Sequence, residues 1–548
     1  MPAAEDARQL CPDLLDGSYD CVDRIVLRAY WHFIQGPGGF RLWWRQWQGS
    51  EAELDDAHLM RVAGRFARRV KAWAKQARVP VIFSAAGERK ESLAEVHLPS
   101  DPKFTGVFLV VVGRAPTSVW SVQHTADGRI RHIERKRPWV NHYAFHIQDL
   151  QWGHVIIRFC PHPPFNALVI LNGHEWVAAE AARRGIGFNK ADNCFTDWSD
   201  AAGLEQIAET LSSESSEGRL LQVCERWIYS AVLCFAVDTA DQERTDFHYD
   251  YSVYQAEYSR NLRFRNGAEM DQVFQRLIDR VRGPLQLKTI CTLFGRQRRP
   301  YRPKGLQRDP KVEVVLERPT YDLIIFRVHF DRLTLKIYTK GEHILRIEAM
   351  AHNTRDLRCG TSLERYGDMS AALRAMVDRF SEVIDCVDTA FIEPGLLDTL
   401  PQASQVGRAR VGGVDLNKAR VRATVESVIA LASIPEGFSA ADVAERVRTI
   451  LSDPAYRTSR AAYDLRKLRG KGLVSKLPCS RRYKSCPQAL RALAALLLLR
   501  DHVIRPLLAG ALHAETTPGS RHTAPRDQPY ATLRRDMNDL FRQVGIAA

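Results

Sequence analysis

The sequence predicts an α+β multidomain protein in which two mixed α/β units with antiparallel sheets precede a small, basic, mainly helical C-terminal domain. Three observations support this fold class. A chain of 548 residues is long enough for about three ordinary domains. Short runs of alternating apolar residues, typical of antiparallel strands, are interspersed with helical periodicity over the first 400 residues. Lys and Arg are concentrated near the C-terminus.

The first α+β unit is predicted over residues 1–205. It opens with the β-rich run DRIVLRAYWHF at 23–33, followed by a helix over 54–76. This helix places apolar residues from Leu59 to Trp73 at helical spacing. Its other side carries a set of basic residues: Arg61, Arg65, Arg68, Arg69 and Lys75. The rest of the unit, to about residue 200, is mostly β.

The second α+β unit, with an antiparallel sheet, is predicted over residues 219–400, after an acidic, Ser-rich boundary. We expect helices over 219–237, 249–264 and 268–285. A basic, Pro-bearing segment at 295–311 is typical of a solvated linker, although it could also contact phosphate. Alternating strands fill 312–352, and helices near 369–388 close the unit.

The distribution of charge indicates a polyanionic partner. The formal net charge is +14, and residues 408–505 hold 20 Lys and Arg against 8 Asp and Glu, an excess of 12. Such a concentration is expected of a protein that binds a phosphate backbone. A surface whose charges served only solubility would mix positive and negative residues.

The remaining bulk features predict a cytoplasmic protein without a membrane partner. The eleven cysteines include no CxxC pair, which is typical of reduced thiols. The N-terminus is acidic and lacks the regions of a signal peptide. The most apolar run, 493–499, is too short to cross a bilayer.

Residues 405–512 supply the elements of a winged helix-turn-helix domain in the required order. Three helices are expected over 422–434, 437–451 and 459–474, followed by a wing over 474–486. Ser439 is the expected N-cap of the second helix, with Asp442 completing a capping-box arrangement. Ser459 is the expected N-cap of the third helix.

The third helix has the composition of a recognition helix. Ala461, Leu465 and Leu468 form an apolar stripe, and basic residues occupy the other positions. Guanidinium groups there could contact phosphates or guanine edges in double-stranded DNA. The predicted nucleic-acid-binding residues of the helix and the wing are Arg460, Tyr463, Arg466, Lys467, Arg469, Lys471, Arg481, Arg482 and Lys484. The alternative is a protein-docking winged helix with incidental basic residues.

Two segments follow the wing. The apolar sequence over 487–510 is expected to form a helix that packs on the domain or pairs with a second copy, which would make a homodimer. Residues 513–548 are expected to form a flexible tail, because the composition of 515–528 is that of a disordered segment.

The segment SRAAYDLRKLRGKGLV and the SRRY wing resemble MarR-like and related winged-helix domains, over about 90 residues. The resemblance implies DNA binding and no reaction. The passages NHYAFHIQDLQWGHV, VILNGHEWVA and LKIYTKGEHILRIE are similar to those of a bacterial protein family of about this length. That second resemblance implies no activity.

Tyr254 and Tyr258 are the first catalytic candidates. In the predicted helix over 249–264 they share a face with Tyr251 and form a YxxxY pair. The spacing resembles the tandem tyrosines of rolling-circle replication initiators of plasmids and phages, which implies attack of a phenolate on a DNA phosphodiester beside a metal held by two histidines. The HUH motif is absent, and the alternative is a buried aromatic stripe.

The strands over 332–340 and 343–352 supply the next candidate. If they pair as a hairpin, one face buries Leu333, Leu335, Ile337, Leu345 and Ile347. The other face shows Lys336, Tyr338, Lys340, Arg346, Glu348 and His352. The KIYxKG and LRIE pattern is similar to a stretch of replication initiators, and Glu348 is the predicted catalytic acid or base. The alternative is a solvated face.

A histidine cluster is a candidate metal site. His142, His146 and His154 are the predicted ligands, close in sequence to Cys160, His162, His174 and Glu175. No spacing matches a zinc or HExxH pattern, so the alternative is ordinary strand and loop histidines. Two ExK strings, at 88–90 and 134–136, resemble the core of restriction-type nucleases, a short pattern that also arises by chance.

Taken together, these features predict a DNA-binding protein, from a mobile or plasmid-like element, that contacts DNA through a C-terminal winged helix. No cofactor is required by this reading. One alternative is an enzyme, a replication-initiator-like or other DNA-cleaving nuclease, which would need Mg or Mn. Others are a binder of structured RNA and a ligand-responsive transcriptional regulator. P-loop, Rossmann, kinase and GxSxG motifs are absent.

Overall fold

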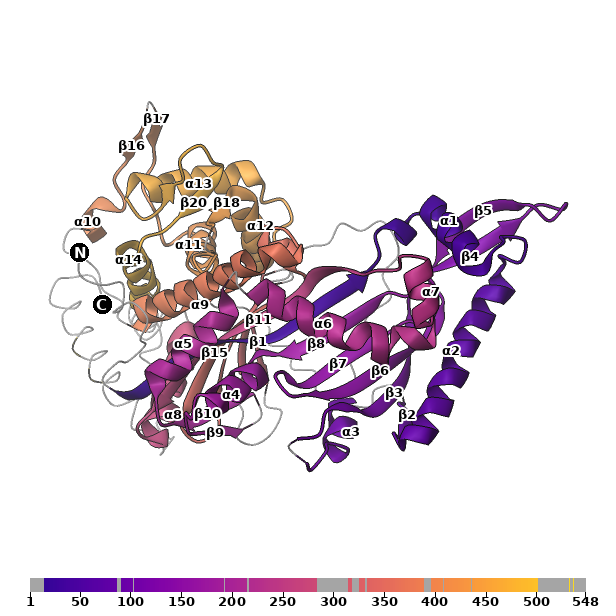
Figure 1. Cartoon of the computed structure of the whole chain (residues 1–548). Helices are drawn as coiled ribbons and strands as arrows, with labels where there is room; N and C mark the ends of the chain where they lie inside the picture. Colours follow the sequence, from indigo (N-terminus) through magenta and orange to yellow (C-terminus); the bar gives the residue numbers. More distant parts are fainter. Residues whose placement is uncertain are drawn as a thin grey trace, which may run out of the picture. The chain divides into compact units, whose positions relative to one another are not determined.

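The computed structural model describes most of the chain. Described residues are 14–85, 90–101, 103–191, 193–213, 216–282, 314–317, 325–330, 333–388, 396–407, 409–434, 436–500, 532 and 536. The chain forms two compact units (Figure 1). The larger, which we call the sheet unit, contains Cys11–Met270 and Cys291–Val377. The C-terminal unit contains residues 271–282 and the described residues from Asp378 onward.

The sheet unit is built on one large mixed sheet. Among the described residues the sheet has eleven strands in the order β12-β13-β14-β15-β11-β1-β8-β7-β6-β3-β2. Its strands are β1 (Leu15–Tyr30), β2 (Val81–Phe83), β3 (Gly106–Pro116), β6 (Trp139–Asp149), β7 (Gly153–Phe159), β8 (Ala167–Asn172), β11 (Asp250–Phe264), β12 (Val314–Glu317), β13 (Ile325–Phe330), β14 (Leu333–Lys340) and β15 (Ile344–Ala351). Neighbouring strands are antiparallel except β2 and β3, which are parallel.

Strands from both predicted α+β units share this sheet. Strand β1 pairs with β8 on one side and with β11 on the other, so sequence from before and after residues 205–219 is joined by backbone hydrogen bonds. The α+β class is therefore confirmed, whereas the expectation of two separate sheets is corrected. Two further two-stranded sheets, β4 (Val119–His124) with β5 (Ile130–Lys136) and β9 (Phe188–Ala191) with β10 (Cys194–Trp198), belong to the same unit.

Helices lie against both faces of the sheet. The helices of the sheet unit are α1 (Pro37–Gln48), α2 (Asp56–Ala77), α3 (Lys90–Val96), α4 (Gly173–Arg183), α5 (Ala201–Ser212), α6 (Glu217–Ala231) and α7 (Thr239–Arg244). Helices α8 (Gly267–Arg282) and α9 (Tyr366–Asp388) begin in the sheet unit and continue into the C-terminal unit. Phe66 of α2 packs on Tyr143 and Phe159, with ring centroids 4.9 and 5.1 Å apart. Because β3 is covered on both faces, its run GVFLVVV is apolar throughout and does not alternate.

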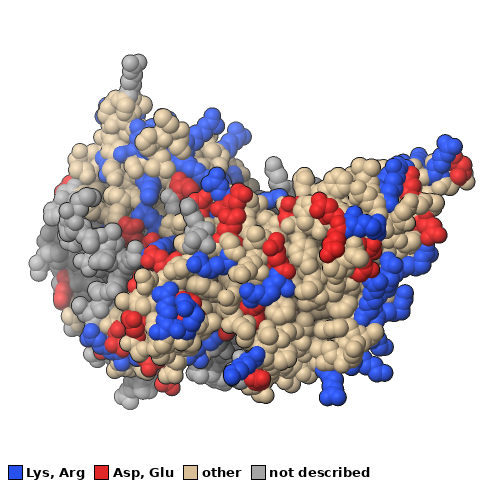
Figure 2. All heavy atoms as spheres, in the orientation of Figure 1, with Lys and Arg blue, Asp and Glu red and all other residues tan. Residues whose placement is uncertain are grey.

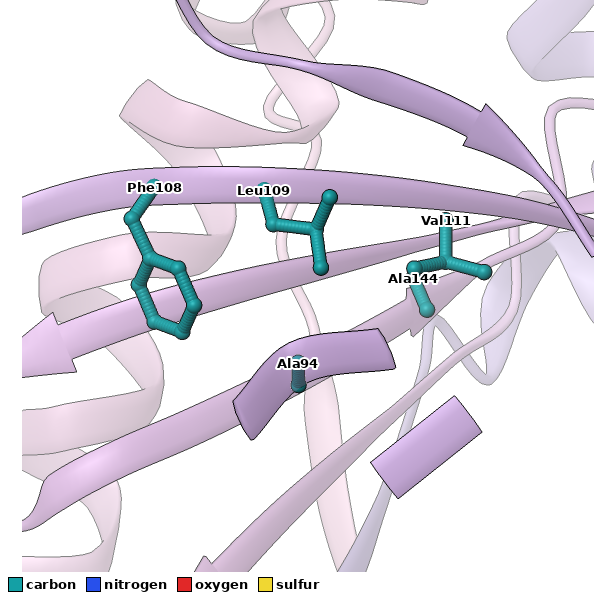
Figure 3. Close-up of a cluster of buried hydrophobic side chains, with 5 residues drawn as sticks. All are labelled: Ala94, Phe108, Leu109, Val111 and Ala144. Carbon is teal, nitrogen blue, oxygen red and sulfur yellow. The ribbon is translucent and has the colours of Figure 1, made fainter. Parts of the chain in front are cut away.

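On the other face, α3 closes a second apolar cluster, shown in Figure 3. Its members are Ala94, Phe108, Leu109, Val111 and Ala144. Ala94 comes from α3, and the other four come from β3 and β6, so the short helix is held by its contacts with these strands. Packing of this kind is the main source of stability for a helix of two turns.

The segment 249–264 differs from its expected helix, because residues 250–264 form strand β11. The aromatic spacing at 251, 254 and 258 fits a helical face, but pairing with β1 and β15 on its two sides outweighs that local pattern. The helices predicted over 219–237 and 268–285 correspond to α6 and α8.

The C-terminal unit contains a compact group of helices and short strands. Its elements are α10 (Leu396–Thr399), β16 (Ser404–Val406), β17 (Ala409–Val411), α11 (Ala419–Leu431), β18 (Phe438–Ser439), α12 (Ala440–Leu451), α13 (Thr458–Gly470), β19 (Ser475–Lys476), β20 (Arg482–Lys484) and α14 (Pro487–Leu498). Strands β18, β20 and β19 form a three-stranded sheet in that order. The apolar helix α14 packs on α11 and buries Leu490, Leu493 and Leu497.

Within the described part of the chain, no helix combines the length and the hydrophobicity needed to span a bilayer. Some expectations lie wholly or partly outside the described residues. They include the basic linker at 295–311, the tail at 513–548 apart from residues 532 and 536, residues 88 and 89 of the ExK string at 88–90, and residues 501–510 of the helix expected over 487–510.

Candidate nucleic-acid interface

Helices α12 and α13 begin differently from each other. Ser439 caps α12 as predicted: its Oγ accepts from the N–H of Asp442 at 3.2 Å, and the Asp442 carboxylate accepts from the N–H of Ser439 at 2.7 Å. This capping box confirms the prediction. The N-cap of α13 is Arg457, and no side chain caps that helix. The predicted cap at Ser459 is therefore wrong, because Ser459 lies inside the first turn.

The inner side of α13 is anchored by apolar contacts and by a buried carboxylate. Ala461, Leu465 and Leu468 are buried, as predicted. Asp464 is also buried, accepts from the hydroxyl of Tyr456 at 2.9 Å and pairs with Arg420 of α11 at 3.0 Å. Because a buried carboxylate is stable only with partners, these contacts fix the rotation of α13 about its axis.

The outer side of α13 is basic. Arg460, Arg466 and Arg469 are exposed, and within the described residues none of their guanidinium groups has an ion-pair or hydrogen-bond partner. Tyr463 lies among them and is 42% exposed, with the ammonium group of Lys467 5.2 Å from its ring centroid. An anchored helix therefore presents three uncompensated guanidinium groups to solvent.

A β-hairpin follows α13, and an open groove lies between this hairpin and the end of the helix. Strands β19 and β20 pair antiparallel, and the groove is lined by the last turn of α13 and by residues 472 and 474–481. Its cationic lining residues are Arg469, Lys476 and Arg481. Both Lys476 and Arg481 are exposed, so the hairpin adds positive charge next to the outer side of the helix.

Two predicted contact residues hold the fold instead of being free. The Arg482 guanidinium donates to the carbonyl of Gly437, which precedes β18, and Lys471 Nζ donates to the carbonyl of Thr399. Lys484 is half-buried on β20. Arg460, Tyr463, Arg466, Arg469 and Arg481 are thus the most accessible of the nine predicted residues.

The sequence did not reveal a second hairpin, β16–β17, at the other side of α13. A Cβ at Gly470 would lie 2.7 Å from the Ser404 Cβ, so the hairpin packs directly on the end of the helix. Arg410 on β17 is exposed, and its guanidinium group has no ion-pair or hydrogen-bond partner among the described residues. The only sequence signals are Gly407 in the turn and the short alternation of apolar and polar residues.

Tyr254 and Tyr258 do not form the expected helical pair. The register of β11 against β1 shifts between Gln255 and Val253, so Tyr254 lies at a bulge, with the guanidinium of Arg28 5.0 Å from its ring. Tyr258 is 1% exposed, and its hydroxyl lies 3.4 Å from Asp20 Oδ2. Burial raises the pKa of Tyr258 well above its ordinary value, which opposes formation of a phenolate.

Glu348 lies on the opposite face of the sheet from Tyr258. It is directly paired with Ser259, the next residue of β11, and paired residues of antiparallel strands share a face. The structure therefore separates the predicted catalytic tyrosine from the predicted catalytic carboxylate by the thickness of the sheet.

The face that carries Glu348 is covered, not solvated. The hairpin β14–β15 forms as predicted and buries Leu335, Ile337, Leu345 and Ile347 on one side. On the other side Arg346 is 0% exposed. It donates to Asn261 Oδ1 (2.8 Å), Ser259 Oγ (3.1 Å), Asp23 Oδ1 (2.9 Å) and the Asn193 carbonyl (2.7 Å).

Asp23 is brought to Arg346 by a β-bulge. Two residues of β1, Asp23 and Arg24, lie opposite Glu257 alone. Burial alone would raise the pKa of Asp23, but Arg346 and His174, whose Nδ1 is 2.7 Å away, lower it to about 2. Burial lowers the pKa of His174, so its imidazole is neutral at pH 7. The cluster is thus a buried ion pair braced by a neutral histidine.

A second carboxylate extends this polar face. Glu348 accepts from Lys336 Nζ at 3.1 Å and from the Tyr338 hydroxyl at 2.9 Å. Nearby, Glu257 accepts from Gln255 Nε2 at 2.7 Å. Burial, and next the negative charge of Glu348, raise the pKa of Glu257 to about 7. The face therefore holds a carboxyl group that is partly protonated at neutral pH.

The predicted metal ligands are not gathered at one point. The rings of His146 and His154 contact each other, with Nδ1 and Nε2 2.9 Å apart, whereas His142 Nε2 lies 2.5 Å from Thr117 Oγ1. In the part of the chain that the structure describes, no group of three or more His, Cys, Asp or Glu side chains could hold a metal ion. The string at 134–136 lies on β5, where Lys136 pairs with Glu134 at 3.7 Å.

Comparisons with protein families, with curated proteins and with solved structures give no match.

Proposed function

We propose that this protein binds double-stranded DNA through a winged helix formed by α11, α12, α13 and the small sheet β18-β20-β19. In this class of domain the third helix enters the major groove and the hairpin that follows contacts the flanking backbone. The order of elements in the C-terminal unit, three helices and then a hairpin paired with a strand between the first two helices, supports the assignment.

The observation that carries the proposal is the outer side of α13. Arg460, Arg466 and Arg469 are exposed and unpaired among the described residues, while Asp464 fixes the opposite side of the helix. Guanidinium groups form bidentate hydrogen bonds with phosphate and with the O6 and N7 atoms of guanine. A partner that only docks as a protein would not require this concentration of uncompensated charge.

The hairpin β19–β20 is the second contact of the proposal. Lys476 and Arg481 lie at the groove beside Arg469, so a phosphate next to the helix would meet cations from both elements. Arg482 supports the hairpin through Gly437 and is not assigned a contact with DNA.

The test is the salt dependence of DNA binding by the full chain. Each phosphate contact contributes about 0.9 to the slope of log affinity against log salt. In the variant with Arg460, Arg466 and Arg469 changed to Gln, we expect weaker binding of a labelled duplex and a slope lowered by about 2 to 3, measured by fluorescence anisotropy.

The matched control removes three exposed cations from the sheet unit: Lys103, Arg137 and Arg183. The control loses the same net charge as the α13 variant but keeps the cations of α13. Its affinity for the duplex should therefore differ only slightly from that of the wild type. An α13 variant that binds the duplex with the affinity and slope of the control would contradict the proposal. Tighter binding of a duplex RNA than of DNA of the same sequence would contradict the choice of DNA.

A further inference from the structure

Helix α2 of the sheet unit carries a second set of unpaired cations. Residues 57–78 contain seven Lys and Arg and no Asp or Glu. Two of the seven have partners: Arg65 lies over the ring of Trp47 at 5.7 Å, and Arg69 pairs with Asp238 at 3.8 Å. The other five are exposed and have no partner within the described residues: Arg61, Arg68, Lys71, Lys75 and Arg78.

These five residues form one stripe. At about 100° per residue Arg61, Arg68, Lys71 and Lys75 fall within about 80° of each other around the helix axis, and Arg78 follows as the C-cap residue of α2. From Arg61 to Lys75 the helical part of the stripe is about 21 Å long, the length of about six base pairs of duplex. Between the cations lie the small residues Gly64, Ala67 and Ala72, which leave room for close approach of a polymer backbone. Figure 2 shows Lys and Arg side chains along α2, near the right-hand edge of the view.

The helix that carries the stripe is firmly placed. Its opposite side buries Leu59, Val62, Phe66 and Val70. At its start the Asp55 side chain accepts from the N–H of His58 at 2.6 Å. The Asp56 carboxylate accepts from the Val122 N–H and the Ser121 hydroxyl of β4, at 2.8 and 3.0 Å. The charges are therefore presented on a preorganised surface, and not on a loop that binding would have to order.

We propose that the α2 stripe, defined as Arg61, Arg68, Lys71, Lys75 and Arg78, is a second, sequence-independent binding surface for the phosphate backbone of nucleic acid. The inference rests on the proposed function in that it takes nucleic acid as the ligand, but it places this contact in the sheet unit. An anionic membrane is a poorer fit, because a membrane-surface helix inserts an apolar face and the apolar face of α2 is buried. Of the described residues of α2, Met60 is the only large apolar side chain that is exposed.

The experiment compares the wild-type chain with three variants and one matched control, all as full-length chains. The stripe variant changes Arg61, Arg68, Lys71 and Lys75 to Gln, which preserves helix propensity. The second is the α13 variant described above, and the third combines both sets. The matched control changes Lys103, Arg137, Arg183 and Arg355, four exposed cations of the same unit, to Gln. Binding of a labelled 30-base-pair duplex and of a labelled 30-nucleotide single strand is measured against salt, and thermal unfolding verifies that each variant is folded.

For the stripe variant we expect the slope of log affinity against log salt to be lowered by about 2 to 4 on at least one of the two nucleic acids. The slope of the control should be close to that of the wild type. The α13 variant should retain salt-dependent binding that the combined variant loses. A stripe variant with the slope of the control overturns the inference, and a lowered slope for the α13 variant would then leave the proposed function intact. The reverse pattern, with only the stripe variant weakened, would refute the winged-helix proposal and support the stripe. If the stripe changes reduce binding to anionic phospholipid vesicles and leave both nucleic acids unaffected, the ligand class is wrong.

Discussion

Replacing Glu257 with Gln should change how the stability of the sheet unit depends on pH. Glu257 is buried on β11, beside Glu348, Lys336, Asp23 and Arg24, and its pKa is raised from 4.5 to about 7. A group whose pKa is raised in the folded state binds protons more tightly there than in the unfolded chain. The stabilising contribution of the protonated form is therefore present below about pH 4.5 and is lost as the pH rises through 7.

The magnitude follows from the two pKa values. A pKa raised from 4.5 to about 7 corresponds to about 3 kcal/mol of free energy of unfolding, lost in the wild type between pH 4.5 and pH 8. Gln has nearly the shape of the neutral carboxyl group and does not ionise. At pH 5 the free energy of unfolding of the variant should lie within about 1 kcal/mol of that of the wild type. At pH 8 it should be higher than that of the wild type by about 2 to 3 kcal/mol.

The assay is urea unfolding followed by tryptophan fluorescence at several pH values from 5 to 8. All eleven tryptophans lie between residues 31 and 227, so the signal reports on the sheet unit alone. Glu205→Gln, at an exposed position of α5, is the control for loss of one carboxylate. If the difference in free energy of unfolding between Glu257→Gln and the wild type were the same at pH 5 and pH 8, the prediction would be refuted.

Two further predictions concern single side chains. Arg346→Met leaves Asp23 buried without its cation and should lower the free energy of unfolding of the sheet unit by about 3 to 5 kcal/mol in the same fluorescence assay. Arg183→Met, the control, removes an exposed ion pair with Glu180 and should lower the free energy of unfolding by less than about 1 kcal/mol. If both variants lost the same free energy of unfolding, the role given to Arg346 would be contradicted. Ser439→Ala should lower the hydrogen-exchange protection of α12 by about 1 kcal/mol. Ser459→Ala should not reduce the protection of α13, and a matching loss there would restore Ser459 as a cap.

Local patterns predicted the parts of the fold that local physics determines. The apolar spacing of α2, the capping box at Ser439, the buried stripe of α13 and the alternation of β14 and β15 are all properties of short segments. The basic outer side of α13 follows from the same periodicity, because a buried Leu465 and Leu468 leave Arg466 and Arg469 outside.

The features that were missed depend on distant segments. The spacing of the tyrosines at 251, 254 and 258 fits a helix, but this segment forms a strand because it pairs with β1 and β15. The cluster around Arg346 requires a bulge at Asp23, a histidine from α4 and an asparagine before β10, and no spacing in the sequence relates these positions. Hairpin β16–β17 is too short for a periodicity and is held by its contact with Gly470.

The pairing of β1 with β11 also bears on how the chain is made. These two strands lie near the centre of the sheet, yet about 220 residues separate them in the sequence. At a translation rate of about 5 to 20 residues per second, β1 would wait roughly 10 to 45 s before its partner leaves the ribosome. During that interval one edge of β1 is an unpaired template for other strands, a situation that favours aggregation and that chaperones relieve. A fragment that ends near residue 205 would keep that edge exposed permanently, so expression of the sheet unit requires the chain at least through β15.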